Sequence, residues 1–203
     1  MIAIIESGGA NIASVQFALE RLGAESVLTK DVKTIQSAEK VLLPGVGAAP
    51  IAMQNLAEYG LIDCIRGLTQ PVMGICLGMQ LLFAASPEGN TPLLGIFDAD
   101  CETFTPTQGR SVPHMGWNRL SKQQDHPLLA GLDEGAHVYF VHSYFAPVTA
   151  QTIAATNYGD DFTAIVAENN FMGCQFHPEN RGWLARKFCV IFWRCHHDHL
   201  SGD

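Results

Sequence analysis

The chain has 203 residues, of which 47% are hydrophobic and 16% are charged. This length and even composition suit one well-buried domain over residues 1–203 rather than two. The formal net charge of −8 argues against a surface built for nucleic acid or anionic lipid. The start of the chain lacks the pattern of a secretory signal, and no apolar run reaches the length of a membrane span. We therefore expect a cytoplasmic protein that does not bind membranes, with its six cysteines as free thiols.

The chain begins with a predicted strand and helix. Residues 2–5 form a short apolar run typical of a buried parallel strand, and apolar residues then recur with a helical period over residues 12–22. Asn11 is a candidate N-cap of this helix. The turn between them lacks the Gly-Lys-Ser/Thr and G-x-G-x-x-G patterns of phosphate-binding loops. We therefore expect a tight turn near a functional rim rather than a nucleotide site.

Two further strands are predicted at residues 27–29 and 41–43, and the second runs into Pro44-Gly45-Val46-Gly47. A helix is then expected through Met53, Leu56 and Leu61. The glycines beside Val46 allow the backbone N–H groups to turn outward at the carboxyl end of a strand, where open α/β sheets bind ligands. The N–H of Val46 is therefore a candidate oxyanion donor, although a proline-glycine turn without chemistry fits the same residues.

Residues 71–83 read as a strand, a sharp turn and a helix, with Cys76 at the turn between Gly74 and Gly78. Small neighbours are what a nucleophile on a strained strand-to-helix turn requires. The turn also places the thiol at the positive end of the following helix, which favours the thiolate. A buried structural cysteine is the alternative.

The second half of the chain has short β-like runs separated by turns. We predict strands at residues 94–97, 137–141 and 152–155, and a hairpin of residues 162–168 and 171–176. These strands should extend the parallel sheet in antiparallel fashion. The expected fold class is therefore α/β, an open three-layer arrangement around a mixed, mostly parallel sheet.

The last predicted strand leads into His177-Pro178-Glu179. A cysteine nucleophile needs a base, a group that orients the base, and donors for the developing oxyanion. His177 and Glu179 can supply the first two, as in a catalytic triad, and the N–H groups of Leu77 and Val46 can supply the donors. Taken alone, His-Pro-Glu is more often a solvated turn.

Residues 74–80 together with 175–179 resemble the triad-type, class I glutamine amidotransferases. Within that family, residues 44–47, 113–118 and 139–144 resemble the glutaminase subunits of imidazole glycerol phosphate synthase in histidine biosynthesis. The resemblance covers residues 1–179 in order. It implies a flavodoxin-like sheet and hydrolysis of L-glutamine to glutamate and ammonia, with Cys76 as nucleophile.

The resemblance also implies a partner and further site residues. Ammonia would pass to a (β/α)₈-barrel cyclase subunit in a heterodimer, and neither metal nor organic cofactor would be required. The positions that match the glutamine site are Gly47, Gln80, Ser143 and Tyr144, and those near the cyclase are Asn11, Trp117 and Tyr139. Core packing is an alternative for Trp117 and Tyr139, and a satisfied core histidine is an alternative for His142.

From about residue 180 to residue 203 the sequence departs from the family pattern. Codons can be chosen for residues 180–195 that, read in another frame, give a family-like tail, so we interpret the tail as the product of a one-nucleotide slip. The tail could also hold a metal with His196, His197, Asp198 and His199.

Two other functions stay open for the whole chain. One is a catalytically impaired subunit that only binds the cyclase, and the other is the amidotransferase of another synthase, which residues 114–118 disfavour.

Overall fold

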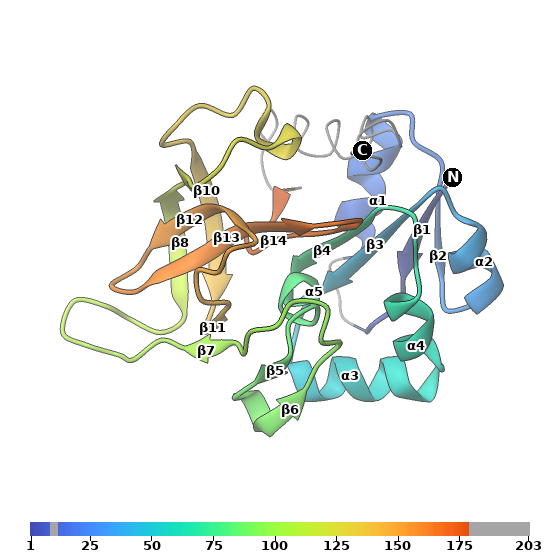
Figure 1. The fold of residues 1–203 in the computed structure, drawn as a ribbon, viewed down its shortest axis with the longest axis horizontal. Coiled ribbons are helices and arrows are strands. Elements are labelled where there is room, and N and C mark those ends of the chain that lie inside the picture. The colour runs from blue at the N-terminus through green and yellow to red at the C-terminus, as the bar shows by residue number, and fades with distance from the viewer. Residues whose placement is uncertain (9–11, 179–203) are drawn as a thin grey trace.

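The computed structural model describes residues 1–8 and 12–178, and its centre is an eight-stranded sheet of order β2-β1-β3-β4-β14-β13-β12-β9 (Figure 1). The first five strands of this order are parallel, and the last three join them in antiparallel fashion. Their bounds are β1 Ile2–Ile5, β2 Ser26–Thr29, β3 Lys40–Gly45, β4 Val72–Cys76, β9 Ser121–Lys122, β12 Thr152–Asn157, β13 Asp161–Glu168 and β14 Phe171–Cys174. The predicted fold, a mostly parallel sheet with an antiparallel extension, is confirmed.

Helices cover both faces of the parallel part of this sheet, with α1 on one face and α3 and α4 on the other (Figure 1). Alternate residues of β1 accordingly belong to two cores: Ile2 and Ile4 pack in the cluster that contains Leu19, and Ala3 and Ile5 in the cluster that contains Leu56. The helices are α1 Ile12–Arg21, α2 Val32–Ser37, α3 Ala49–Glu58, α4 Leu61–Arg66 and α5 Leu77–Gln80, with short 3-10 turns η1 Glu88–Asn90 and η2 Pro127–Leu129. The molecule therefore has the expected three layers.

The helix predictions need two corrections. Phe17 was expected on the buried face of α1, but its side chain is 57% exposed, because the buried stripe runs through Val15, Ala18 and Leu19. The helix predicted through residues 53–61 is two helices, since Gly60 takes a left-handed conformation, with φ 67° and ψ 27°, between α3 and α4.

The strand predicted at residues 94–97 is wrong. Gly95 has a φ of +63°, which ends any extended run. The backbone N–H groups of Leu94, Gly95 and Ile96 instead donate to the carbonyls of Leu81, Phe83 and Leu82. The apolar character of this run reflects packing against the turn after α5, and periodicity cannot distinguish such a run from a strand.

The strand predicted at residues 137–141 exists as β10 (His137–His142), but it does not join the main sheet. It pairs in antiparallel register with β8 (His114–Arg119), and this pair stands across the end of the sheet formed by β12 and β13 (Figure 1). Two smaller pairs, β5 (Ala85–Ser86) with β6 (Thr91–Pro92) and β7 (Glu102–Thr103) with β11 (Tyr144–Phe145), complete the fold. Over the described part of the chain, no helix has the length and apolar character that crossing a membrane requires.

Candidate active site

Cys76 occupies a strained turn at the end of β4 and the start of α5. Its backbone has φ 55° and ψ −115°, a conformation that residues other than glycine rarely adopt. The residue is only 8% exposed. Such backbone strain persists only where the surrounding structure enforces it, and strained residues are common at functional sites. The predicted elbow is therefore present, although α5 has only four residues and is shorter than the predicted helix.

Three glycines make the elbow possible by removing β-carbons from close backbone contacts. A β-carbon on Gly74 would lie 2.6 Å from the carbonyl oxygen of Gly78, and one on Gly45 would lie 2.6 Å from the nitrogen of Gly78. A β-carbon on Gly78 would overlap the carbonyl oxygen of Leu43. The close approach of β3, β4 and α5 thus depends on these three positions.

The predicted base lies at the same sheet edge as Cys76. Strand β14 runs parallel to β4 with Cys174 opposite Ile75, so the chain emerges from β14 beside the elbow and continues through Gln175 to the half-buried His177. Parallel neighbours bring their carboxyl ends to one edge, which explains how two residues about a hundred positions apart come to the same edge. Glu179, the predicted orienting carboxylate, lies outside the described residues, as do Asn11 and residues 180–203 with the possible metal site.

Both predicted oxyanion donors belong to segments next to Cys76 in the sheet or along the chain. Gly45, the last residue of β3, is opposite Cys76 in the sheet register, and Val46 follows it at the half-buried edge. Gly47, also predicted to contact glutamine, has a φ of +96° and is exposed. Leu77 is the first residue of α5. The structure therefore places the end of β3 and the N-terminus of α5 next to Cys76.

The other predicted glutamine-site residues meet behind the thiol. The side-chain nitrogen Nε2 of Gln80 donates to the carbonyl oxygen of Tyr144 at 2.8 Å and to Oε1 of Gln175, also at 2.8 Å. Nε2 of Gln175 in turn lies 3.8 Å from Sγ of Cys76. Ser143 is half-buried next to Tyr144, and its carbonyl accepts from the N–H of Phe104 at 3.2 Å.

The sequence reasoning assigned no role to Gln175, which is completely buried. A usable signal was present, because a glutamine directly after a buried strand must find hydrogen-bond partners inside the protein. Its partner on one side is Sγ of Cys76, the predicted nucleophile.

Two buried histidines contact each other beneath the β8–β10 pair. Nδ1 of His114 lies 3.1 Å from Nε2 of His142, and Nδ1 of His142 lies 2.9 Å from the carbonyl oxygen of Tyr144. Burial lowers the pKa of His114 to about 4 and that of His142 to about 3, because a desolvated imidazolium is unfavourable. The interpretation of His142 as a satisfied core histidine is therefore confirmed.

The outer face of the β8–β10 pair exposes apolar side chains, with the exposed Arg119 and His137 at one end. Met115, Trp117 and Val141 are 61%, 47% and 37% exposed, and the ring of Trp117 packs edge-on against that of Tyr139 at 5.4 Å between centroids. The alternate residues of both strands face inward, as pleating requires. The alternative that Trp117 packs in the core is therefore wrong. We call the outer residues Met115, Trp117, Tyr139 and Val141 of the β8–β10 pair the hairpin face.

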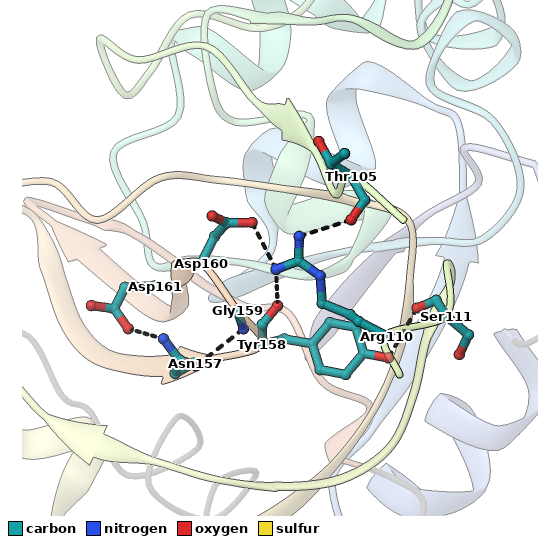
Figure 2. Close-up of polar contacts among 8 residues, drawn as sticks. All are labelled: Thr105, Arg110, Ser111, Asn157, Tyr158, Gly159, Asp160 and Asp161. Atoms are coloured by element: carbon teal, nitrogen blue, oxygen red, sulfur yellow. Dashed lines mark hydrogen bonds and ion pairs between the residues drawn. The ribbon is translucent and has the colours of Figure 1, made fainter. Parts of the chain in front are cut away.

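Arg110 connects the loop that leads into β8 to the turn between β12 and β13 through hydrogen bonds and an ion pair (Figure 2). Its guanidinium donates to the carbonyl oxygens of Tyr158 at 2.8 Å and Thr105 at 2.7 Å, and pairs with Asp160 at 3.1 Å. The ring of Tyr158 stacks on His114 with 3.9 Å between centroids. This arginine therefore supports the histidine pair from the side of the β12–β13 turn.

No group of three His, Cys, Asp or Glu side chains placed as metal ligands occurs within residues 1–8 and 12–178. Four of the six cysteines, Cys64, Cys76, Cys101 and Cys174, lie in the described ranges, and all four are free thiols.

The chain resembles known proteins over most of its length. The family "Glutamine amidotransferase class-I" matches residues 3–189. The imidazole glycerol phosphate synthase subunit HisH of Xanthomonas campestris is 53% identical over 178 residues, covering 88% of this chain and 89% of the relative. The HisH subunit of Colwellia psychrerythraea is 46% identical over 204 residues, covering 93% of this chain and 90% of the relative.

The fold is shared with solved structures. A crystal structure of a glutamine amidotransferase superposes with a TM-score of 0.71 at 22% identity, covering 95% of this chain and 98% of the other. The strained Cys76 on its glycine-lined elbow agrees with the similarity in sequence and with the similarity in fold. The chain belongs to the class-I glutamine amidotransferase family, among the HisH subunits of imidazole glycerol phosphate synthase.

Proposed function

We propose that this protein hydrolyses L-glutamine to glutamate and ammonia and supplies the ammonia for imidazole glycerol phosphate synthesis in histidine biosynthesis. The observation that carries the proposal is the strained Cys76 elbow, beside which β14 delivers His177. Relatives at about half identity are named as subunits of the synthase that gives this product its name.

The chemistry assigned to the site is acyl transfer to sulfur. Sγ of Cys76 attacks the γ-carboxamide carbon, and the oxyanion is held by the N–H groups of Val46 and Leu77. His177, oriented by Glu179, takes the thiol proton and returns it to the departing nitrogen, so the C–N bond breaks and ammonia leaves. Water then cleaves the thioester to give glutamate and restores the thiol.

The glutamine would lie against Gly47, Gln80, Ser143 and Tyr144. Both hydrogens of the Gln80 amide nitrogen are already engaged within the protein, by the carbonyl of Tyr144 and by Gln175. Gln80 therefore offers glutamine its amide oxygen rather than its nitrogen.

The partner in this proposal is a (β/α)₈-barrel cyclase subunit, which forms a heterodimer with this chain in the cytoplasm. The name HisH subunit of the relatives supports a partner within a synthase. The hairpin face is the surface we assign to it, because exposed aromatic residues commonly anchor interfaces, and Asn11, outside the described residues, remains a proposed contact from the family resemblance. Ammonia would pass from the thiol site into the barrel without release to solvent.

Glutamate release, measured with and without the cyclase subunit, tests the activity. We expect release in the complex and none from Cys76→Ala in the complex, while this variant still binds the cyclase. Cys64→Ala, which alters a buried cysteine of α4, serves as the matched control and should keep the activity. Hydrolysis by the Cys76→Ala variant would show that the nucleophile is wrong, and failure to complement loss of the histidine pathway step would favour another synthase.

The unusual sequence of residues 180–203 bears on a second candidate function. We propose that it arises from a one-nucleotide slip at about Asn180 in the gene or its sequence, within one domain that otherwise spans the chain. The alignments with the Xanthomonas relatives cover 88% of the chain and so leave a segment unmatched, whereas the family match extends to residue 189. If the tail is native, a subunit that binds the cyclase without releasing glutamate becomes the alternative. An intact reading frame on resequencing, together with the matching protein mass, would end the frame-slip idea.

A further inference from the structure

A continuous series of hydrogen bonds joins the β8–β10 pair to the sulfur of Cys76. It runs from Nδ1 of His114 to Nε2 of His142 at 3.1 Å, and from Nδ1 of His142 to the carbonyl oxygen of Tyr144 at 2.9 Å. Gln80 donates to the same carbonyl at 2.8 Å and to Oε1 of Gln175 at 2.8 Å, and Nε2 of Gln175 faces Sγ of Cys76 at 3.8 Å. Apart from the half-buried Tyr144, the side chains of the series are all buried.

The carbonyl of Tyr144 determines which ring nitrogen of each histidine carries the hydrogen. A carbonyl oxygen can only accept, so Nδ1 of His142 must carry the hydrogen. In a neutral imidazole the other nitrogen is then an acceptor, and Nε2 of His142 takes its hydrogen bond from Nδ1–H of His114. The remaining nitrogen of His114, Nε2, faces the amide nitrogen of Asn118 at 3.4 Å. Each nitrogen of the pair therefore has one assigned role.

The same carbonyl sets the direction of both glutamine amides. The Gln80 atom that faces it must be the nitrogen, whose second hydrogen then reaches Gln175. The Gln175 atom that meets this hydrogen must be the oxygen, so its nitrogen points to the sulfur. If Gln175 turned its amide over, an oxygen would face the thiol and a nitrogen would face a nitrogen. The network thus directs an N–H donor, rather than an acceptor, at Cys76.

We propose that Gln175 is a positioning residue that directs an N–H group at the Cys76 sulfur, and that the Tyr144 carbonyl couples this orientation to the histidine pair behind the hairpin face. The inference rests on the proposed glutaminase function and adds a physical connection between docking surface and nucleophile. An N–H donor favours the thiolate that attacks glutamine. A partner that shifts β10 would move His142 and, through the Tyr144 carbonyl, the donor at the sulfur.

The first test changes the donor at the sulfur. Gln175→Met fills a similar volume without an N–H group, and Gln175→Glu keeps the acceptor for Gln80 but offers no N–H when ionised. In the complex with the cyclase, both variants should lower kcat of glutaminase about tenfold with KM changed less than twofold. The iodoacetamide alkylation of Cys76, located by peptide mass spectrometry, should also move to higher pH.

Gln70→Met is the matched control. The half-buried amide of Gln70 donates to the carbonyl of Ile35 at 2.9 Å. Gln70 lies just before the start of β4, whereas Cys76 lies at the end of that strand. Loss of this amide tests for a general effect of removing a partly buried hydrogen bond. We expect kcat and the alkylation profile of Gln70→Met to stay within twofold of wild type.

The second test changes the histidine that holds the Tyr144 carbonyl. His142→Gln can still donate an N–H to that carbonyl, whereas His142→Phe cannot. We expect the activation of glutaminase by the cyclase, taken as the ratio of rates with and without it, to fall at least fivefold in His142→Phe and to recover in part in His142→Gln. Binding of the cyclase, measured by titration, should change little in either variant.

Two outcomes would overturn the inference: an alkylation profile and kcat in both Gln175 variants equal to those of wild type, or equal loss of activation in His142→Phe and His142→Gln. Failure of the proposed function is a separate result, since the wild-type complex would then release no glutamate. Alkylation of Cys76 is measurable even in that case, so the positioning role of Gln175 can be judged on its own.

Discussion

Gly78 lies so close to the carbonyl oxygen of Leu43 that no β-carbon can be placed between them. Both groups belong to the backbone, of α5 and β3 respectively, so neither can rotate away as a side chain would. The contact holds the first turn of α5 against β3, and the geometry of the Cys76 elbow depends on it.

We therefore expect Gly78→Ala to destabilise the fold by about 3 kcal/mol, the upper range for overpacking a filled core. Urea unfolding followed by circular dichroism measures this change. Gly67→Ala is the matched control, because a β-carbon there would lie 3.3 Å from the nearest atom and the φ is −90°. Equal stability of the two variants would show that the elbow can relax around the methyl group.

Arg110 should be important for stability rather than for chemistry. Arg110→Met would leave the carbonyls of Tyr158 and Thr105 without their charged donor, and we expect a loss of about 3 kcal/mol in the free energy of unfolding. Asp160→Asn, which alters only the half-exposed partner, should cost less than about 1 kcal/mol. Thermal unfolding of both variants separates the carbonyl contacts from the ion pair, and similar losses in the two would contradict this assignment.

The histidine pair should make stability depend on pH. The pKa values of His114 and His142 are lowered to about 4 and about 3 by burial, whereas an unfolded chain protonates histidine near 6.5. The unfolded state thus binds more protons below pH 6.5, so stability is complete above that pH and decreases as the pH falls. Between pH 7 and pH 5 each histidine should remove up to about 2 kcal/mol from the free energy of unfolding.

Urea unfolding at a series of pH values measures this dependence. His142→Gln should reduce the slope between pH 7 and pH 5, whereas Val141→Ala, which alters an exposed residue of the same strand without an ionisable group, should leave it unchanged. A wild-type stability that stays flat over this range would mean that the pair is not kept neutral by burial.

Trp117 is the expected anchor for the cyclase. Trp117→Ala should weaken the complex by about 2 kcal/mol, which is typical of an aromatic residue at the centre of an interface. Ile51→Ala, on α3 and 62% exposed, should leave the affinity unchanged. Isothermal titration of the cyclase into each variant gives the comparison, and equal affinities would move the docking surface away from the hairpin face.

Local patterns were sufficient for several features. The apolar runs at residues 2–5 and 72–76 predicted buried parallel strands, because such strands are covered on both faces. The glycines around Cys76 predicted the elbow, since a strained turn with close backbone neighbours excludes side chains. Turn residues at Asn169-Asn170 located the hairpin of β13 and β14.

Contacts between distant residues could not be read in the same way. The pairing of β10 with β8 rather than with the main sheet follows from packing at the end of that sheet, and so does the exposure of Trp117. The link from His142 through the Tyr144 carbonyl to Gln80, Gln175 and Cys76 joins residues up to 99 positions apart. The sequence by itself was enough to predict the parallel strands and the glycine-lined elbow, because these depend on near neighbours along the chain. Only the tertiary structure decided which buried polar groups meet, because each must find its hydrogen-bond partner wherever the packed fold places one.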